Sequence, residues 1–83
     1  MTMLSPLQGC AATIEALIFA SDRPIREREL IVHVPDNMDL AEVITAIALR
    51  YDATSGIELC QVGDGWAFRT KAEIAERLSQ HKQ

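Results

Sequence analysis

The chain of 83 residues carries eight Lys and Arg against twelve Asp and Glu, for a formal net charge of −4 at pH 7. Affinity for DNA comes largely from cations that release its counterions, so an acidic balance disfavours a DNA-binding domain unless cations cluster locally. Hydrophobic residues make up 48% of the chain, enough for one small folded domain, and we expect neither a secretory signal nor a membrane span.

A first helix is predicted to run from Pro6 to about Ala20. Ser5 is a good N-cap, Pro6 suits the first helical position, and Gln8 completes a capping box with Ser5. Apolar residues at helical spacing form the stripe that should face the core: Leu7, Ala11, Ile14, Leu17 and Ile18.

The opposite side of this helix is less polar than a solvent-facing surface usually is. It is shared by Gln8, Ala12, Glu15 and Phe19. An exposed Phe on a helix that is apolar most of the way round suggests a second burial, beyond the core. Either a neighbouring element of the same chain covers Phe19, or Phe19 contacts a second molecule.

A turn and a short extended piece at Pro24–Ile25 are predicted next, followed by a short helix from Glu27 to about His33. The carboxylates of Glu27 and Glu29 suit the positive end of the helix dipole. Arg26 occupies the N-cap and is a poor capping residue, so we expect this helix to fray at its start, at a local cost of about 0.5–2 kcal/mol.

The third helix is predicted to begin after Asp39 and to end near Asp52. Asp39 and Glu42 form a capping-box arrangement at its start. The residues predicted to face the core are Leu40, Val43, Ile44, Ile47 and Tyr51. The residues predicted to face outward are Glu42, Thr45, Ala46, Leu49, Arg50 and Asp52.

Two alternating apolar runs around Asp64–Gly65 predict a β-hairpin with these two residues as its turn. In that register Gly63 opposes Trp66 and Gln61 opposes Phe68. A three-residue loop starting one residue earlier would mix the two faces, and the buried face normally selects the register, so the two-residue turn is preferred. One face should hold Ile57, Leu59, Trp66 and Phe68, and the other Glu58, Cys60, Val62, Ala67 and Arg69.

A last helix is predicted after Thr70, which would cap it together with Glu73, and Ile74 and Leu78 would be its apolar anchors. The element order is then helix, short strand, helix, helix, strand, strand, helix. This order predicts an α+β, mainly helical, winged helix-turn-helix fold: three helices, a small antiparallel β-hairpin wing and a C-terminal helix. We expect a single domain over residues 1–83.

Residues that could carry chemistry are few and scattered. Cys10 and Cys60 lack the Cys-x-x-Cys or His spacing typical of a metal site, and a redox role would require the two thiols to be adjacent. His33 lies at a helix end, and no Ser or Cys stands in a pattern with a His and an acid. We expect no catalytic residue, metal or cofactor, and interpret the chain as a non-enzyme.

The surface expected to contact DNA in this fold is poor in cations. In DNA-binding helix-turn-helix domains the second helix of the pair enters the major groove, and here that helix exposes one cation among two acids. The wing tip carries one carboxylate and no cation, in Gly63, Asp64, Gly65 and Trp66. The one basic cluster, Arg23, Arg26 and Arg28, is neutralised by Asp22, Glu27 and Glu29. By analogy of fold we interpret the chain as a protein-protein module.

Two stretches of the sequence resemble the segregation and condensation protein B (ScpB) family. The stretch IEALIFASDRPIRERELIVHV resembles the family's opening, through Ile14, Ala16, Leu17, Ile18, Phe19, Ala20, Ser21, Pro24 and Ile25. The stretch VGDGWAFRTKAEIAERL resembles its first wing and the helix after it, through Gly65, Trp66, Phe68, Arg69, Thr70 and Lys71. The two stretches cover most of residues 12–79.

The resemblance implies a non-catalytic accessory subunit of the bacterial SMC–kleisin condensin complex. Such a subunit dimerises, binds the kleisin ScpA and, through it, SMC, and acts in chromosome condensation and segregation and so in the cell cycle and cell division. It would be cytoplasmic and associated with the nucleoid, without sequence-specific DNA binding. The alternative is a small DNA-binding winged-helix transcriptional regulator.

The ScpB family has two consecutive winged helices, and the first is associated with homodimerisation. We expect this chain to correspond to the first, with the second absent. The family often has Ser at the start of the second helix, where this chain has Arg26. The apolar outer side of the first helix suggests a homodimer surface formed by Leu4, Leu7, Ala11 and Phe19.

Overall fold

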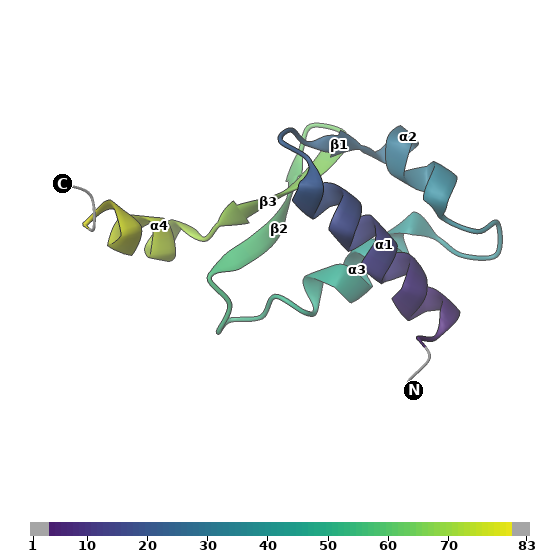
Figure 1. The fold of residues 1–83 in the computed structure, drawn as a ribbon, viewed down its shortest axis with the longest axis horizontal. Helices are drawn as coiled ribbons and strands as arrows, with labels where there is room; N and C mark the ends of the chain where they lie inside the picture. Colours follow the sequence, from purple (N-terminus) through teal and green to yellow (C-terminus); the bar gives the residue numbers. More distant parts are fainter. Residues whose placement is uncertain (1–3, 81–83) are drawn as a thin grey trace.

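The computed structural model describes residues 4–80. Its elements are α1 (Pro6–Ala20), β1 (Ile25–Arg26), α2 (Glu27–Leu30), the 3-10 helix η1 (Ile31–His33), α3 (Leu40–Ala48), β2 (Ile57–Val62), β3 (Gly65–Thr70) and α4 (Ala72–Ser79). The strands form one antiparallel sheet in the order β1-β3-β2 (Figure 1). The predicted α+β winged-helix architecture is confirmed. Within residues 4–80, no helix is long and apolar enough to cross a membrane.

The core lies where α1 packs against α3, with β1, α2 and the sheet closing its sides (Figure 1). The predicted inward stripes of both helices supply most of it. Its buried side chains are Ala11, Ile14, Ile18, Ile25, Leu30, Val43, Ile44 and Ile47. Leu7, Leu17, Leu40 and Tyr51 pack against its edge, half-buried. Each fully buried aliphatic side chain contributes about 1.5–3 kcal/mol to folding.

The start of α1 is as predicted, but its capping box is one-sided. The Ser5 hydroxyl accepts a hydrogen bond from the Gln8 backbone N–H at 3.1 Å. The Gln8 side chain turns away and its Oε1 accepts from Arg50 Nη2 at 2.8 Å. At α3, the Asp39 backbone N–H donates to Glu42 Oε1 as predicted, at 3.4 Å. This helix ends at Ala48, four residues earlier than expected.

The backbone at the start of α2 is better hydrogen-bonded than we expected from Arg26 at the N-cap. Glu29 Oε1 accepts a hydrogen bond from the Arg26 backbone N–H at 3.1 Å. The same carboxylate pairs with Arg23 at 3.3 Å. The hydrogen bond from Arg23 is the main cause that lowers the pKa of Glu29, and the bond from Arg26 adds to it. Glu29 therefore offsets the expected fraying.

The hairpin register differs from the prediction by a slide of two residues. Leu59 pairs with Phe68, and Val62 pairs with Gly65, so the turn is formed by Gly63–Asp64. Both registers place the same side chains on the same faces, since side chains alternate with a period of two. The predicted faces are therefore correct, while the predicted Asp64–Gly65 turn is wrong.

The two glycines of the wing have different roles, which explains the error. Gly63 has φ 61°, the positive φ that a two-residue hairpin turn with glycine first requires. Gly65 is buried in β3 and pairs with Arg26 of β1. A Cβ at Gly65 would lie 2.9 Å from the Ile25 carbonyl oxygen. Gly65 is needed for the close approach of β1, and the turn does not use it.

The prediction for the last helix was one residue early. Thr70 still belongs to β3, where it pairs with Ile57, and Lys71 occupies the N-cap. Because β3 continues to this point, α4 starts beyond the core and lies apart from α1 and α3 (Figure 1). Ile74 is half-buried, but Leu78 is 56% exposed and does not anchor the helix to this chain.

Gly65→Ala should destabilise the fold by about 1–3 kcal/mol, because the new methyl group must displace the backbone of β1. Gly9→Ala is the matched control: nothing lies within 4 Å of its Cβ position in α1, and alanine favours a helix by up to about 1 kcal/mol. Urea unfolding of both variants at one protein concentration tests this. Equal stability of Gly65→Ala and the wild type would contradict the assigned role of Gly65.

Candidate protein-interaction surface

Large apolar side chains are exposed at several places on the described surface. They are Leu4, Phe19, Ile31, Val32, Leu49, Val62 and Leu78. Phe19 is 75% exposed, so no element of residues 4–80 covers it, and that reading of the sequence is wrong. Leu49 is 76% exposed on the outward side of the third helix. Phe19 lies on α1 and Leu49 caps the end of α3, the two helices that form the core.

A polar clamp joins α1 to the end of α3. Arg50 forms an ion pair with Glu15 and also donates to Gln8, while the Tyr51 hydroxyl donates to the other oxygen of Glu15. The side chains of Arg50 and Glu15 are only 31% and 23% exposed. The Tyr51 ring packs on Phe68 with its centroid at 5.0 Å and the planes at 55°. The clamp fixes the segment after α3 against the outer side of α1.

On one side of the clamp lies a hollow of about 290 Å³, the outer α1 surface, lined by Ala12, Glu15, Ala16, Phe19 and Tyr51. Of the residues expected at a homodimer surface, Phe19 lines this hollow and Leu4 is 61% exposed just before α1. Leu7 is half-buried and lines a different hollow. Ala11 is fully buried in the core and offers no surface to a partner, which corrects its inclusion.

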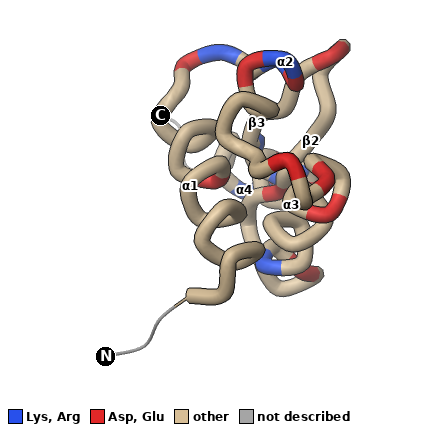
Figure 2. Tube along the Cα trace, turned by 90° about the vertical axis from the view of Figure 1, so that its right-hand side faces the viewer, with Lys and Arg blue, Asp and Glu red and all other residues tan. Residues whose placement is uncertain are grey.

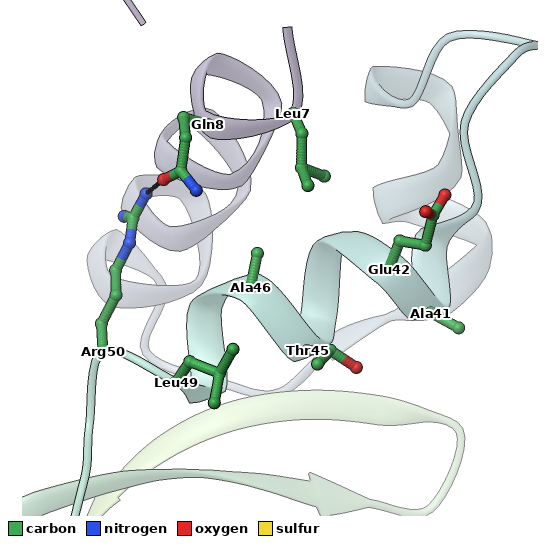
Figure 3. A pocket seen from close by; sticks show the side chains of 8 residues that line it. All are labelled: Leu7, Gln8, Ala41, Glu42, Thr45, Ala46, Leu49 and Arg50. Atoms are coloured by element: carbon green, nitrogen blue, oxygen red, sulfur yellow. Dashed lines mark hydrogen bonds between the residues drawn. The ribbon is translucent and has the colours of Figure 1, made fainter. Parts of the chain in front are cut away.

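On the other side of the clamp lies a groove of about 630 Å³ between the two helices, the α1/α3 groove. It is lined by Leu7, Gln8, Ala41, Glu42, Thr45, Ala46, Leu49 and Arg50. Figure 3 shows Leu7 on the α1 side, Ala46 on the α3 side, the Arg50–Gln8 contact at one end and Glu42 toward the other. Half of these residues are apolar, and apolar atoms make up most of the surface that they expose in the groove.

The wing tip is smaller than predicted, since only Gly63 and Asp64 form the turn. Gly65 and Trp66 belong to β3 and face the rest of the fold. The Trp66 indole N–H donates to Glu27 Oε2 at 2.9 Å, and the Glu27 backbone N–H donates to the Asp64 carbonyl oxygen, also at 2.9 Å. Trp66 is thereby held beside α3, where it lines a second hollow.

The second hollow, of about 350 Å³, lies on the far side of α3 from the groove. Its lining is Glu27, Leu40, Ala41, Ile44, Thr45 and Trp66. Ala41 and Thr45 line both hollows, so the exposed face of α3 separates them. Sequence reasoning placed Thr45 outward correctly, but it gave no sign that Trp66 would lie next to it, 21 residues further along the chain.

Most cations of the described chain are engaged by acids or carbonyl groups. Arg23 pairs with Glu29, Arg50 with Glu15 and Arg69 with Glu58. The Lys71 ammonium donates to a backbone carbonyl. Figure 2 shows acidic positions around α3 and mixed charges at α2. The face of α3 that would enter a DNA groove therefore carries no concentrated positive charge.

Over residues 4–80, no group of three or more His, Cys, Asp or Glu side chains could hold a metal ion. Both cysteines are free. The Cys10 thiol donates to the His33 carbonyl oxygen at 3.4 Å, and Cys60 lies in β2 opposite Ala67. The two thiols thus belong to different parts of the fold.

Comparison with known proteins identifies the family. The family model described as segregation and condensation complex subunit ScpB matches residues 12–83. This chain belongs to the ScpB family. No curated protein sequence matches it. The family match covers both stretches on which the resemblance was based.

Three solved structures share the fold. One, a dimer of an ScpB N-terminal domain complexed with an ScpA peptide, is 25% identical, with a TM-score of 0.77 over 93% of this chain and 92% of that one. A conserved hypothetical protein from Chlorobium tepidum is 24% identical (TM-score 0.73; 90% and 49% coverage). ScpB from Mycobacterium tuberculosis is 21% identical (TM-score 0.69; 96% and 51%). Our chain spans about half the length of the last two.

The clamp should change the ionisation of Tyr51, which is the single tyrosine of the chain. Its hydrogen bond to Glu15, followed by burial and the charge of Glu15, raises the pKa of Tyr51 above its usual value of 10.0. The folded state thus favours the protonated phenol. This stabilisation is complete below about pH 10 and is lost as pH rises through the higher pKa of the folded protein.

An ultraviolet absorbance titration of Tyr51 should show its ionisation above pH 10.0, and Glu15→Gln should bring the midpoint back toward or below that value. Arg50, which lowers the pKa of Tyr51, would then act without Glu15 opposing it. Circular dichroism over the same pH range separates titration of the folded state from alkaline unfolding. The same midpoint in both proteins would contradict the clamp.

Proposed function

We propose that this chain is a non-catalytic accessory subunit of the SMC–kleisin complex and acts in chromosome condensation and segregation. It would do so by forming a homodimer and by binding ScpA. The observation that carries the proposal is the family match, joined to the similar solved ScpB N-terminal domain, which is a dimer complexed with an ScpA peptide. The site of action would be the cytoplasm, at the nucleoid through the complex.

The surface supports a scaffolding role. Exposed apolar side chains on α1 and at the end of α3 flank a partly buried polar clamp, and such patches on a small domain mark contacts with other proteins. The acidic net charge and the engaged cations favour a protein partner over DNA. We therefore do not favour the transcriptional regulator.

For the homodimer we propose the outer α1 surface, centred on Phe19 and extended by Leu4. Phe19 is the largest exposed apolar side chain on α1 and lies beside the small residues Ala12 and Ala16. Small neighbours permit the close approach of a second helix, and a twofold interface would place Phe19 of each copy on the same surface of the other. Leu7, also expected there, lines the α1/α3 groove.

The proposed function is tested by titrating the chain with the ScpA protein of the same genome in a calorimeter. We expect a dissociation constant in the micromolar range or tighter. The absence of heat and of co-elution at high micromolar concentrations of both proteins would overturn the assignment of kleisin binding to this domain.

Phe19→Asp should raise the dissociation constant of the homodimer by about tenfold or more, because it places a charge at the centre of an apolar contact. The helical circular dichroism signal should be unchanged, since Phe19 lies outside the core. Val32→Asp is a matched control, because Val32 is also 75% exposed but lies in η1. Sedimentation velocity of the three proteins decides; a dimer weakened only by Val32→Asp would place the interface elsewhere.

A transcriptional regulator would bind DNA, whereas the proposed accessory subunit should not. We expect no binding of a labelled duplex at low salt by fluorescence anisotropy, because the net charge is −4 and acids engage Arg23 and Arg50, two of the cations near the helix-turn-helix. Micromolar or tighter binding that falls steeply as salt is added would show phosphate contacts and would favour the regulator.

A further inference from the structure

The exposed face of α3 is bordered by apolar hollows on both sides. The α1/α3 groove, of about 630 Å³, lies toward α1, and the hollow of about 350 Å³ lies toward β1 and β3. Ala41 and Thr45, which have short side chains, line both hollows. We call this continuous region the α3 face.

The chemistry of the α3 face suits an apolar ligand of some length. Leu7, Ala46 and Leu49 line the groove, while Leu40, Ile44 and Trp66 line the other hollow. Leu49 is 76% exposed, so a large apolar area of this face is left to solvent. A groove bordered by helices with small residues at its centre is the surface into which an amphipathic helix lays its apolar side.

The charges on the α3 face have one dominant sign. Glu42 and Glu27 line its two hollows, and both are exposed. The cation in the lining, Arg50, forms an ion pair with Glu15 and a hydrogen bond with Gln8. The electrostatic potential over the face is therefore negative, which repels a phosphate backbone and attracts Lys and Arg.

We propose that the α3 face binds an amphipathic helical segment of the kleisin partner, with apolar side chains in the groove and Lys or Arg beside Glu42 and Glu27. This inference rests on the proposed function and adds where on this chain the partner binds. A second copy of the chain is the less favoured occupant, since a twofold contact through this face would bring Glu42 and Glu27 of the two copies close together.

Thr45→Arg tests the shape of this site. Thr45 is exposed at the centre of the face, and arginine favours a helix more than threonine does, so the variant should fold. We expect it to raise the dissociation constant for ScpA by about tenfold or more. Ala75→Arg is the matched control: it adds the same charge at an exposed position of α4, away from the face, and should bind as the wild type does.

Trp66 supplies an independent signal, as the single tryptophan of the chain and part of the lining. A synthetic ScpA peptide without tryptophan should change its fluorescence emission on binding to the wild type and to Ala75→Arg. For Thr45→Arg, the half-maximal change in emission should require a peptide concentration about tenfold higher or more than for the wild type.

Glu42 tests the charge of the site. Glu42→Lys should weaken ScpA binding several-fold and reduce its dependence on salt. Glu42→Gln keeps the oxygen that accepts from the Asp39 backbone N–H, so it removes the charge while retaining the cap of α3. If both variants bind ScpA more weakly than the wild type, and Glu42→Gln loses less affinity than Glu42→Lys, the result supports attraction of a basic segment.

The outcomes separate this proposal from the proposed function. If the wild type does not bind ScpA, both are overturned. If it binds and Thr45→Arg binds equally well, the site lies elsewhere and the proposed function stands. If Thr45→Arg loses self-association while still binding ScpA with wild-type affinity, the face belongs to the homodimer and the kleisin site is overturned.

Discussion

The structure depends on the contact of β1 with β3 at Gly65. Ile25 and Arg26 pair with Trp66 and Gly65, and the absence of a Cβ lets the two backbones approach. This pairing fixes the hairpin at one edge and buries Ile25 in the core. It also starts α2, whose first residue, Glu27, donates its backbone N–H to the hairpin turn and accepts a hydrogen bond from the Trp66 indole with its carboxylate. A two-residue strand thereby determines where the wing lies relative to α3.

Periodicity in the sequence was sufficient for the helices and for the strand faces, because both follow from which side chains must leave water. Ile14, Ile18, Val43 and Ile47 were placed correctly on this ground. The register of the hairpin could not follow from it, since sliding the strands by two residues leaves every face unchanged. The register depends on Gly65, which must lack a side chain because the backbone of Ile25, 40 residues earlier in the chain, lies against it.

The candidate surface was only partly visible in the sequence. An apolar outer side of the first helix could be read from spacing, and Phe19 is indeed exposed. Ala11 was placed both in the core and on that surface, and the core position excludes the other. The clamp of Glu15 with Arg50 and Tyr51 joins residues 35 and 36 positions apart, so no local sequence pattern predicts it. Arg50 and Tyr51 follow the end of α3 at Ala48, and both contact Glu15 on α1.

The same clamp helps to explain how a winged helix can bind a protein in place of DNA. The shape of the fold presents α3 outward in either case, and the charge of the exposed side chains determines the ligand. Here Arg50, which follows α3, is engaged by Glu15 of α1, and the acids Glu42 and Glu27 remain exposed beside apolar hollows. One ion pair within the domain therefore removes a phosphate contact, joins the two helices and leaves an acidic, apolar face. An amphipathic helix that carries Lys and Arg complements both the apolar hollows and the acids of that face, while the phosphate backbone of a nucleic acid would be repelled by those acids.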